Sequence, residues 1–121
     1  HLIKPIAQAG VQYFCVDDAH FKAVGLEDKD LMGRYTSEEQ GATVDIYPIS
    51  KDMRYHIPYS QPHEVIDYLI SQASEDGQRV SFYFDDGEKF GVWPGTYQSV
   101  FVEGWLDRFF QALEDASDII N

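Results

Sequence analysis

The chain has 121 residues, a length that fits one domain or part of one. Hydrophobic residues make up 44% and aromatic residues 15% of it, which suffices for a packed core and argues against disorder. The formal net charge of -12 would repel nucleic-acid phosphates and anionic lipids, so we expect neither nucleic acid nor membrane as a partner. No apolar run approaches the roughly 20 residues that span a bilayer.

The single cysteine, Cys15, lies inside an apolar run, where we expect it to be a buried thiol. One cysteine forms no disulfide within the chain and no zinc cluster of the Cys-x-x-Cys type. This usage fits a reducing compartment. We therefore expect a cytoplasmic protein, and we expect neither a cofactor nor a metal.

The first elements predicted along the chain are a helix and a strand. Residues 1–9 carry apolar side chains at helical spacing, and Gly10 suits the end of that helix. The run VQYFCV, residues 11–16, is continuously apolar. Such a run predicts a strand covered on both faces, as in a parallel sheet.

A polar stretch and a hairpin follow. Residues 27–34 predict a short polar helix or a turn. Residues 34–49 predict a hairpin that turns at Gln40–Gly41, with apolar positions on the second arm.

The middle of the chain predicts a loop and then a helix. Residues 54–62 are rich in aromatic side chains and predict a loop. Ser60 suits the N-cap of the next helix, and Pro62 suits its first turn. The buried stripe of this helix is predicted to be Val65, Ile66, Leu69 and Ile70.

The remaining sequence predicts a strand, a loop and a helix. Residues 79–84 form a second apolar run that predicts a buried strand, and residues 86–100 predict a loop. A final helix over about 102–116 has the apolar face Val102, Trp105, Leu106, Phe109 and Leu113. Strands that alternate with helices predict an α/β fold with a parallel sheet or barrel.

Each predicted apolar strand is followed by two adjacent aspartates, Asp17–Asp18 and Asp85–Asp86. In parallel α/β folds the carboxyl ends of the strands open on one face, so we expect four carboxylates near one rim. Like charges at close range raise the pKa of one carboxyl, which suits general-acid catalysis near neutral pH. The alternative is that these aspartates cap the next helix or order a turn.

Aromatic and polar side chains stand near these pairs. Trp93 and Tyr97 are either core residues or stacking faces for a sugar ring, and beside a carboxylate cluster we favour the sugar. His20 is either a hydrogen-bonded structural residue or a group that contacts the substrate. Glu88 either pairs with Lys89 or orients the loop of the active site.

The segment FDDGEKFGVWPGTY, residues 84–97, closely resembles a signature of glycoside hydrolase family 57, the group that contains α-amylase-like enzymes and 4-α-glucanotransferases. VDDAHFKAVGL (16–26) and RYHIPYSQPHEVIDYL (54–69) also fit, so the resemblance covers essentially the whole chain. It implies an irregular (β/α)7 barrel. We therefore expect an α/β fold that is the second half of such a barrel, with parallel strands, an inserted hairpin and residues 1–121 as a single partial catalytic domain.

The resemblance also implies roles for individual residues. Enzymes of this family retain anomeric configuration with two carboxylates, a glutamate nucleophile and an aspartate general acid/base. The aspartate corresponds to Asp86, with Asp85 shaping its environment and Trp93 lining a sugar subsite. Further residues that we expect to bind the substrate, an α-glucan oligosaccharide or polysaccharide, are Asp18, His20 and Glu88.

The family's glutamate lies on an earlier strand, in a segment that would end just upstream of His1. The His-Gln-Pro motif that opens these domains, and the later region that completes the enzyme, are also missing from the sequence. We therefore expect a fragment of a retaining α-amylase or 4-α-glucanotransferase for α-1,4-glucans that is inactive alone. Its open strand edges would favour self-association.

Two other functions remain open. A metal-dependent polysaccharide deacetylase also has an Asp-Asp-Gly motif after an apolar strand, but it needs a His-x-x-x-His pair, and no two histidines here have that spacing. A non-catalytic glucan-binding or assembly domain would also carry aromatics in its loops. An EF-hand does not fit, because DDGEKF lacks the alternating oxygen ligands of a calcium loop.

Overall fold

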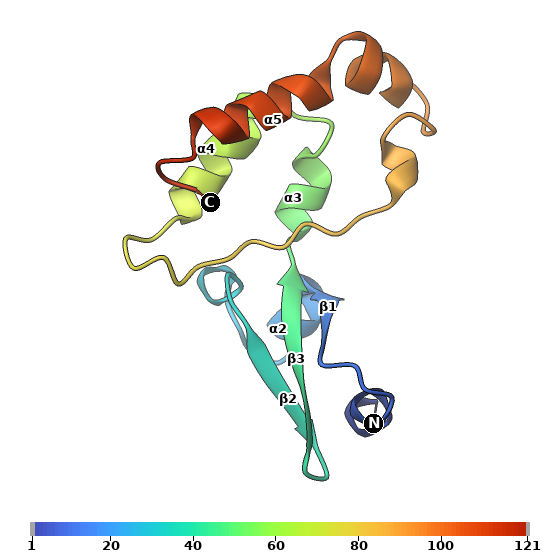
Figure 1. Cartoon of the computed structure of the whole chain (residues 1–121), viewed down its shortest axis with the longest axis vertical. Helices are drawn as coiled ribbons and strands as arrows, with labels where there is room; N and C mark the ends of the chain where they lie inside the picture. The colour runs from blue at the N-terminus through green and yellow to red at the C-terminus, as the bar shows by residue number, and fades with distance from the viewer. Residues whose placement is uncertain (1, 121) are drawn as a thin grey trace. The chain divides into compact units, whose positions relative to one another are not determined.

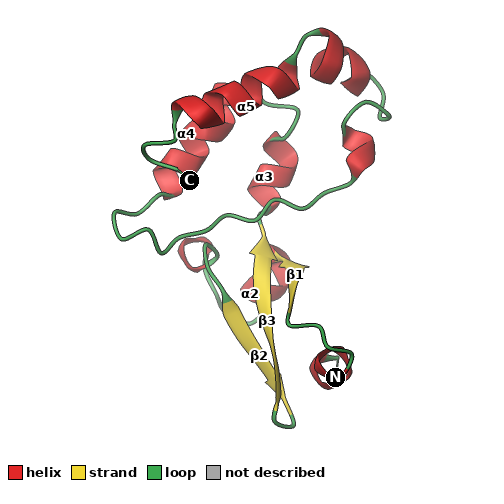
Figure 2. Ribbon diagram, viewed as in Figure 1, coloured by secondary structure: helices red, strands yellow, loops and turns green. Residues whose placement is uncertain are grey.

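The computed structural model describes residues 2–120, so His1 and Asn121 of the predicted domain lie outside the described residues. The chain divides into two compact units. The first, called the sheet unit below, comprises His1–Ser50 and Val80–Phe82. The second, called the helical unit, comprises Lys51–Arg79 and Tyr83–Asn121. The strands drawn in Figure 2 all belong to the sheet unit.

Within residues 2–120, three strands form one mixed sheet in the order β1-β3-β2. The central strand is β3 (Ala42–Ile49), which pairs in parallel with β1 (Tyr13–Asp17) and antiparallel with β2 (Tyr35–Glu39). Figure 1 shows β3 between its two partners. The fold is therefore α/β, as predicted, but its sheet is mixed rather than parallel.

The predicted hairpin is confirmed at its predicted turn. Glu39 pairs with Ala42, so Gln40 and Gly41 form a two-residue loop. Both have positive φ, 52° and 79°. Two-residue hairpin loops favour this conformation because its twist matches that of the strands, and glycine adopts it without a steric cost.

Short helices complete the sheet unit. They are α1 (Ile3–Gln8), α2 (Asp18–Lys22) and the 3-10 turn η1 (Asp28–Asp30). The first agrees with the predicted helix, and η1 agrees with the predicted polar helix or turn. No element was expected over the residues of α2, whose Phe21 is buried.

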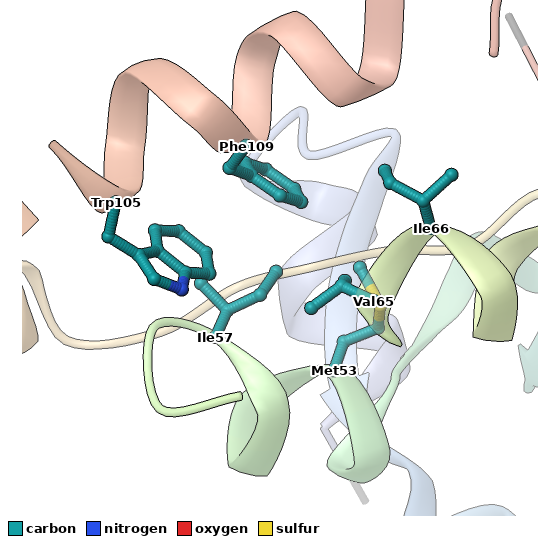
Figure 3. Packing of buried hydrophobic residues seen from close by; sticks show 6 residues of the cluster. All are labelled: Met53, Ile57, Val65, Ile66, Trp105 and Phe109. Carbon is teal, nitrogen blue, oxygen red and sulfur yellow. The ribbon is translucent and has the colours of Figure 1, made fainter. Parts of the chain in front are cut away.

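The helical unit is built on α3 (Lys51–His56), α4 (Pro62–Gln72) and α5 (Trp105–Asp115). Figure 1 shows α5 running along α4. Figure 3 shows two aromatic rings of α5 directed toward apolar side chains of α3, α4 and the connection between them. The buried members of this core are Met53, Ile57, Val65, Ile66, Trp105 and Phe109.

Helices α4 and α5 agree with the predicted ones in position and largely in face. Leu69, Ile70, Leu106 and Leu113 pack against the buried core, as the apolar spacing predicts. Val102 does not, since it is 60% exposed and lies in a separate π-helical turn, η3 (Gln98–Val102), before α5. The 3-10 turn η2 (Gly87–Lys89) falls within the predicted loop 86–100, and η3 begins inside that loop and ends beyond it.

The buried strand predicted over residues 79–84 is wrong. Only Phe82 makes a bridge, to Ile49, and Val80 and Phe84 are exposed. The reason is that the strand beside it ends. Because β3 stops at Ile49 and α3 begins at Lys51, little extended backbone remains for pairing.

Three local predictions also need correction. The first strand is not fully covered on both faces, because β1 begins at the exposed Tyr13 and its other residues, Cys15 among them, are only half-buried. The predicted loop 54–62 begins inside α3. The N-cap of α4 is Gln61 rather than Ser60, whose hydroxyl hydrogen-bonds His56 Nδ1 at 2.8 Å. None of the helices within residues 2–120 is long and apolar enough to cross a membrane.

The neighbours Phe109 and Phe110 test the core of the helical unit, because the first is 9% and the second 56% exposed. Replacing Phe109 by Ala should lower the free energy of unfolding by about 3–5 kcal/mol, since it removes a buried ring and leaves a cavity. The matched change Phe110→Ala should cost less than about 0.5 kcal/mol. Denaturant unfolding of the chain followed by circular dichroism measures both, and equal losses would contradict this assignment of the core.

Candidate active site

The segment that follows Phe84 is held by its own backbone hydrogen bonds. The N–H of Lys89 donates to the carbonyl of Asp86 at 3.1 Å, which forms η2. The N–H groups of Val92 and Trp93 both donate to the carbonyl of Glu88 at 3.0 Å. These bonds give an otherwise irregular segment a defined path.

Thr96 and Gly91 fix the second part of this segment. Thr96 is buried, and its hydroxyl accepts the N–H of Gly91 at 3.1 Å and donates to the carbonyl of Trp93 at 2.7 Å. Gly91 has a φ of +115°, and a Cβ placed there would lie 2.9 Å from Cε2 of Phe101. Glycine is therefore required by both the backbone conformation and the close approach of the ring.

The ammonium group of Lys89 lies at the centre of the site. Lys89 is only 6% exposed. Its Nζ donates to Oδ2 of Asp85 and, at 2.6 Å, to the carbonyl of Arg54. The ring centroids of Tyr59 and Trp93 lie 5.6 Å and 5.7 Å from the same nitrogen, within the range of cation–π attraction.

Asp85 is the buried partner of this ammonium, with a side chain only 1% exposed. Its Oδ1 accepts the N–H of Asp86 at 2.9 Å and lies 3.3 Å from Nε of Arg54. Burial by itself would raise the pKa of Asp85. The hydrogen bonds from Lys89 and Asp86, together with the charges of Lys89 and Arg54, outweigh burial and lower the pKa. Asp85 is therefore held as a carboxylate.

Two tyrosines lie in the field of that carboxylate. The pKa of Tyr83 is raised well above its usual range, mainly by burial and secondly by the negative charge of Asp85. The same two causes raise the pKa of Tyr59. Both phenols stay neutral at physiological pH, so Lys89 and Arg54 are the groups that balance the charge of Asp85.

Asp86 differs from its neighbour in exposure and in hydrogen bonding. Its side chain is exposed, and although the residue precedes η2, its carboxylate makes no capping hydrogen bond. The capping alternative therefore does not describe Asp86. It does describe Asp17, whose Oδ1 accepts the N–H of Ala19 at 3.0 Å and caps α2.

The other predicted site residues differ in exposure and in the unit to which they belong. Asp18 is buried at the start of α2, 3.8 Å from Nζ of Lys22, and His20 on the same helix is exposed. Both belong to the sheet unit, whereas the second aspartate pair belongs to the helical unit, so the gathering of four carboxylates at one rim stays a prediction. Trp93 is 40% exposed, and Glu88 is exposed.

The open question about Lys89 has a clear answer. Its ammonium pairs with Asp85, four residues earlier, rather than with Glu88. Two residues around this pair were missed: Arg54, which comes from α3, and Tyr59, which follows it. The four-residue spacing of Asp85 and Lys89 is a visible signal in the sequence, but no local pattern points to a residue 35 positions away.

Within residues 2–120, no group of three or more histidine, cysteine, aspartate or glutamate side chains is placed to hold a metal ion.

Comparison with known proteins gives consistent matches along the chain. The model of glycosyl hydrolase family 57 matches residues 1–121. A crystal structure of the 4-α-glucanotransferase from Thermococcus litoralis superposes with a TM-score of 0.89 at 44% identity, over 93% of this chain and 18% of that one.

Two curated relatives, both named α-amylase, also match nearly the whole chain. The chain is 51% identical to α-amylase 1 of Dictyoglomus thermophilum, over 95% of this chain and 17% of the relative. It is 41% identical to an α-amylase of Pyrococcus horikoshii, over 99% of this chain and 19% of the relative. The chain thus spans less than a fifth of the length of these relatives.

The lowered pKa of Asp85 makes a prediction about stability and pH. A carboxyl whose pKa is lower in the folded than in the unfolded state stabilises the fold above the unfolded value, about 3.9. The stabilisation is lost as the pH falls through the folded value. Replacing Asp85 by Asn should cost about 3–5 kcal/mol at neutral pH, because it leaves the Lys89 ammonium without its buried partner.

The measurement is the unfolding free energy of wild type and variant between pH 2 and pH 7. The difference between them should be constant above about pH 5 and shrink at lower pH. Asp67→Asn, at an exposed position of α4, is the matched control and should show a difference near zero throughout. A wild-type-to-D85N difference that does not change with pH would contradict the ion-pair assignment.

Proposed function

This chain belongs to glycosyl hydrolase family 57, and we propose that the protein containing it cleaves or transfers α-glucans with retention of anomeric configuration. The relatives that support this are named α-amylase and 4-α-glucanotransferase. The structural observation that carries the proposal is the contrast between two adjacent carboxylates. Asp85 is buried and paired, while Asp86 is exposed and makes no cap.

That contrast assigns the two aspartates different tasks. Asp85 is held ionised by Lys89 and Arg54, so it has no proton to give. Asp86 is accessible to a substrate, and general acid–base catalysis requires a carboxyl group that can reach the glycosidic oxygen. We therefore assign Asp86 as the general acid/base and Asp85 as the group that shapes its surroundings.

The reaction follows double displacement. A glutamate carboxylate attacks the anomeric carbon, the bond to the glycosidic oxygen breaks, and that oxygen takes the proton of Asp86. Asp86, now a carboxylate, removes a proton from water or from a sugar hydroxyl. The freed oxygen attacks the anomeric carbon and displaces the glutamate, which restores the enzyme with two inversions and net retention.

The remaining candidates are assigned to substrate binding. The partly exposed ring of Trp93 offers an apolar face to the CH-rich side of a sugar. Glu88, in the same segment, is proposed to contact sugar hydroxyls, and the substrate contacts expected of Asp18 and His20 stay predictions. The choice between hydrolysis and transfer depends on whether water or a sugar reaches the glycosyl intermediate first, so both outcomes belong to the proposal.

The family resemblance assigns the nucleophilic glutamate to sequence that precedes this chain. A retaining mechanism needs both carboxylates about 5–5.5 Å apart. We therefore propose that the 121 residues alone do not turn over α-glucans.

Replacing Asp86 by Asn in the protein that contains this chain tests the assignment. General acid–base catalysis contributes about 10²–10⁴-fold, so release of reducing ends from an α-1,4-glucan should fall by about that factor. Asp67→Asn removes an exposed carboxylate of α4 and should leave the rate unchanged. A glucan-binding domain without catalysis would show no turnover to lose, and undiminished turnover in D86N would refute the role of Asp86.

A further inference from the structure

We propose that Lys89 is a positioning residue that sets the direction of the Asp86 carboxyl group through the buried carboxylate of Asp85. The inference rests on the proposed function of Asp86. Lys89 then has a part in the reaction besides balancing the charge of Asp85.

The ammonium of Lys89 is confined by its contacts. It has three protons to donate, and two of its partners are Oδ2 of Asp85 and the carbonyl of Arg54. The rings of Tyr59 and Trp93 lie against the same nitrogen. Because the residue is 6% exposed, water has little access with which to replace any of these partners.

The path from Lys89 to Asp86 has two steps. The ammonium holds one oxygen of Asp85, and the other oxygen of the same carboxylate accepts the N–H of Asp86 at 2.9 Å. That hydrogen bond restricts the peptide plane from which the Asp86 side chain projects. Without the ammonium, the Asp85 carboxylate would lose its principal partner in a buried place, where a lone carboxylate is strongly disfavoured.

Rearrangement of Asp85 would then release the backbone of Asp86. The carboxyl group of a general acid must lie within hydrogen-bond reach of the leaving oxygen, and a displacement of about 1 Å can cost about 100-fold in rate. The other contacts of Asp85 do not replace Lys89, since Arg54 is partly exposed and approaches at 3.3 Å. The geometry thus makes the direction of Asp86 depend on Lys89.

The test compares two substrates that differ only in their need for an acid. A maltooligosaccharide requires protonation of its leaving oxygen, whereas α-maltosyl fluoride releases fluoride with little help. The parameter is kcat/KM, which reports the steps up to cleavage at the anomeric carbon. The ratio of the two values does not depend on how much of the protein is folded, so a partly unfolded variant still gives a result.

In the protein that contains this chain, Lys89→Met should lower kcat/KM for the oligosaccharide by about 100-fold. The loss with the fluoride should be much smaller. Lys89→Arg, which retains charge and donors, should recover part of the oligosaccharide activity. Lys51→Met is the matched control, because that lysine lies over the ring of an exposed tyrosine on α3 and should leave the ratio unchanged.

An equal loss on both substrates would overturn the inference, because a purely structural role of Lys89 lowers both. The variant Asp86→Asn, measured on the same pair, separates the two proposals. If D86N spares the fluoride and K89M does not, the Lys89 inference fails and the role of Asp86 stands. If D86N keeps its activity on the oligosaccharide, the proposed function itself fails, and the Lys89 inference fails with it.

Discussion

A buried ion pair between Lys89 and Asp85 is the constraint on which the segment after Phe84 depends. Removing two charges from water costs free energy. This cost is offset only where the two charges lie close together and hydrogen bonds satisfy their remaining donors and acceptors. The chain supplies them from the carbonyl of Arg54, the backbone of Asp86 and two aromatic rings. A loop that must satisfy so many partners at once has few alternative conformations.

The same pair explains how adjacent carboxylates acquire opposite character. Asp85 and Asp86 share a backbone and a sequence context, yet one is held as an anion in the interior and the other is exposed. Two carboxyl groups in different surroundings are a recurrent arrangement in catalytic sites. Here Asp85 contacts the ammonium of Lys89, whereas Asp86 is exposed and makes no capping hydrogen bond.

Sequence patterns predicted those parts of the fold whose cause is local. The Gln40–Gly41 turn is encoded by residues that tolerate positive φ, and α4 and α5 by apolar side chains at helical spacing. The failed prediction over 79–84 has a non-local cause. An apolar run becomes a strand only where extended backbone is available beside it, and β3 ends before it can provide more than one bridge.

In the candidate site, too, the sequence predicts the features with a local cause and misses those with a non-local cause. The motif predicts that the carboxylates after Phe84 are functional, but it does not reveal which one is buried, because neighbours in sequence look equivalent. Asp85 lies near Arg54, and its partner Lys89 lies over Tyr59, and both residues come from a segment that the sequence alone predicts as a loop. The short helix α3 was missed since its six residues mix charged and aromatic side chains without a clear period.

The inaccessibility of Lys89 has a practical consequence for chemical labelling. Amine-directed acylating reagents need a solvated amine, and those on Lys22 and Lys29, with side chains 41% and 72% exposed, are open to such reagents in the folded chain. The amine of Lys89 becomes reactive only when the segment around it opens. A peptide mass map of acylated protein would therefore show local opening of the segment after Phe84 as a label on Lys89. Activity assays and spectroscopy report averages over the whole molecule and do not assign the opening to a residue.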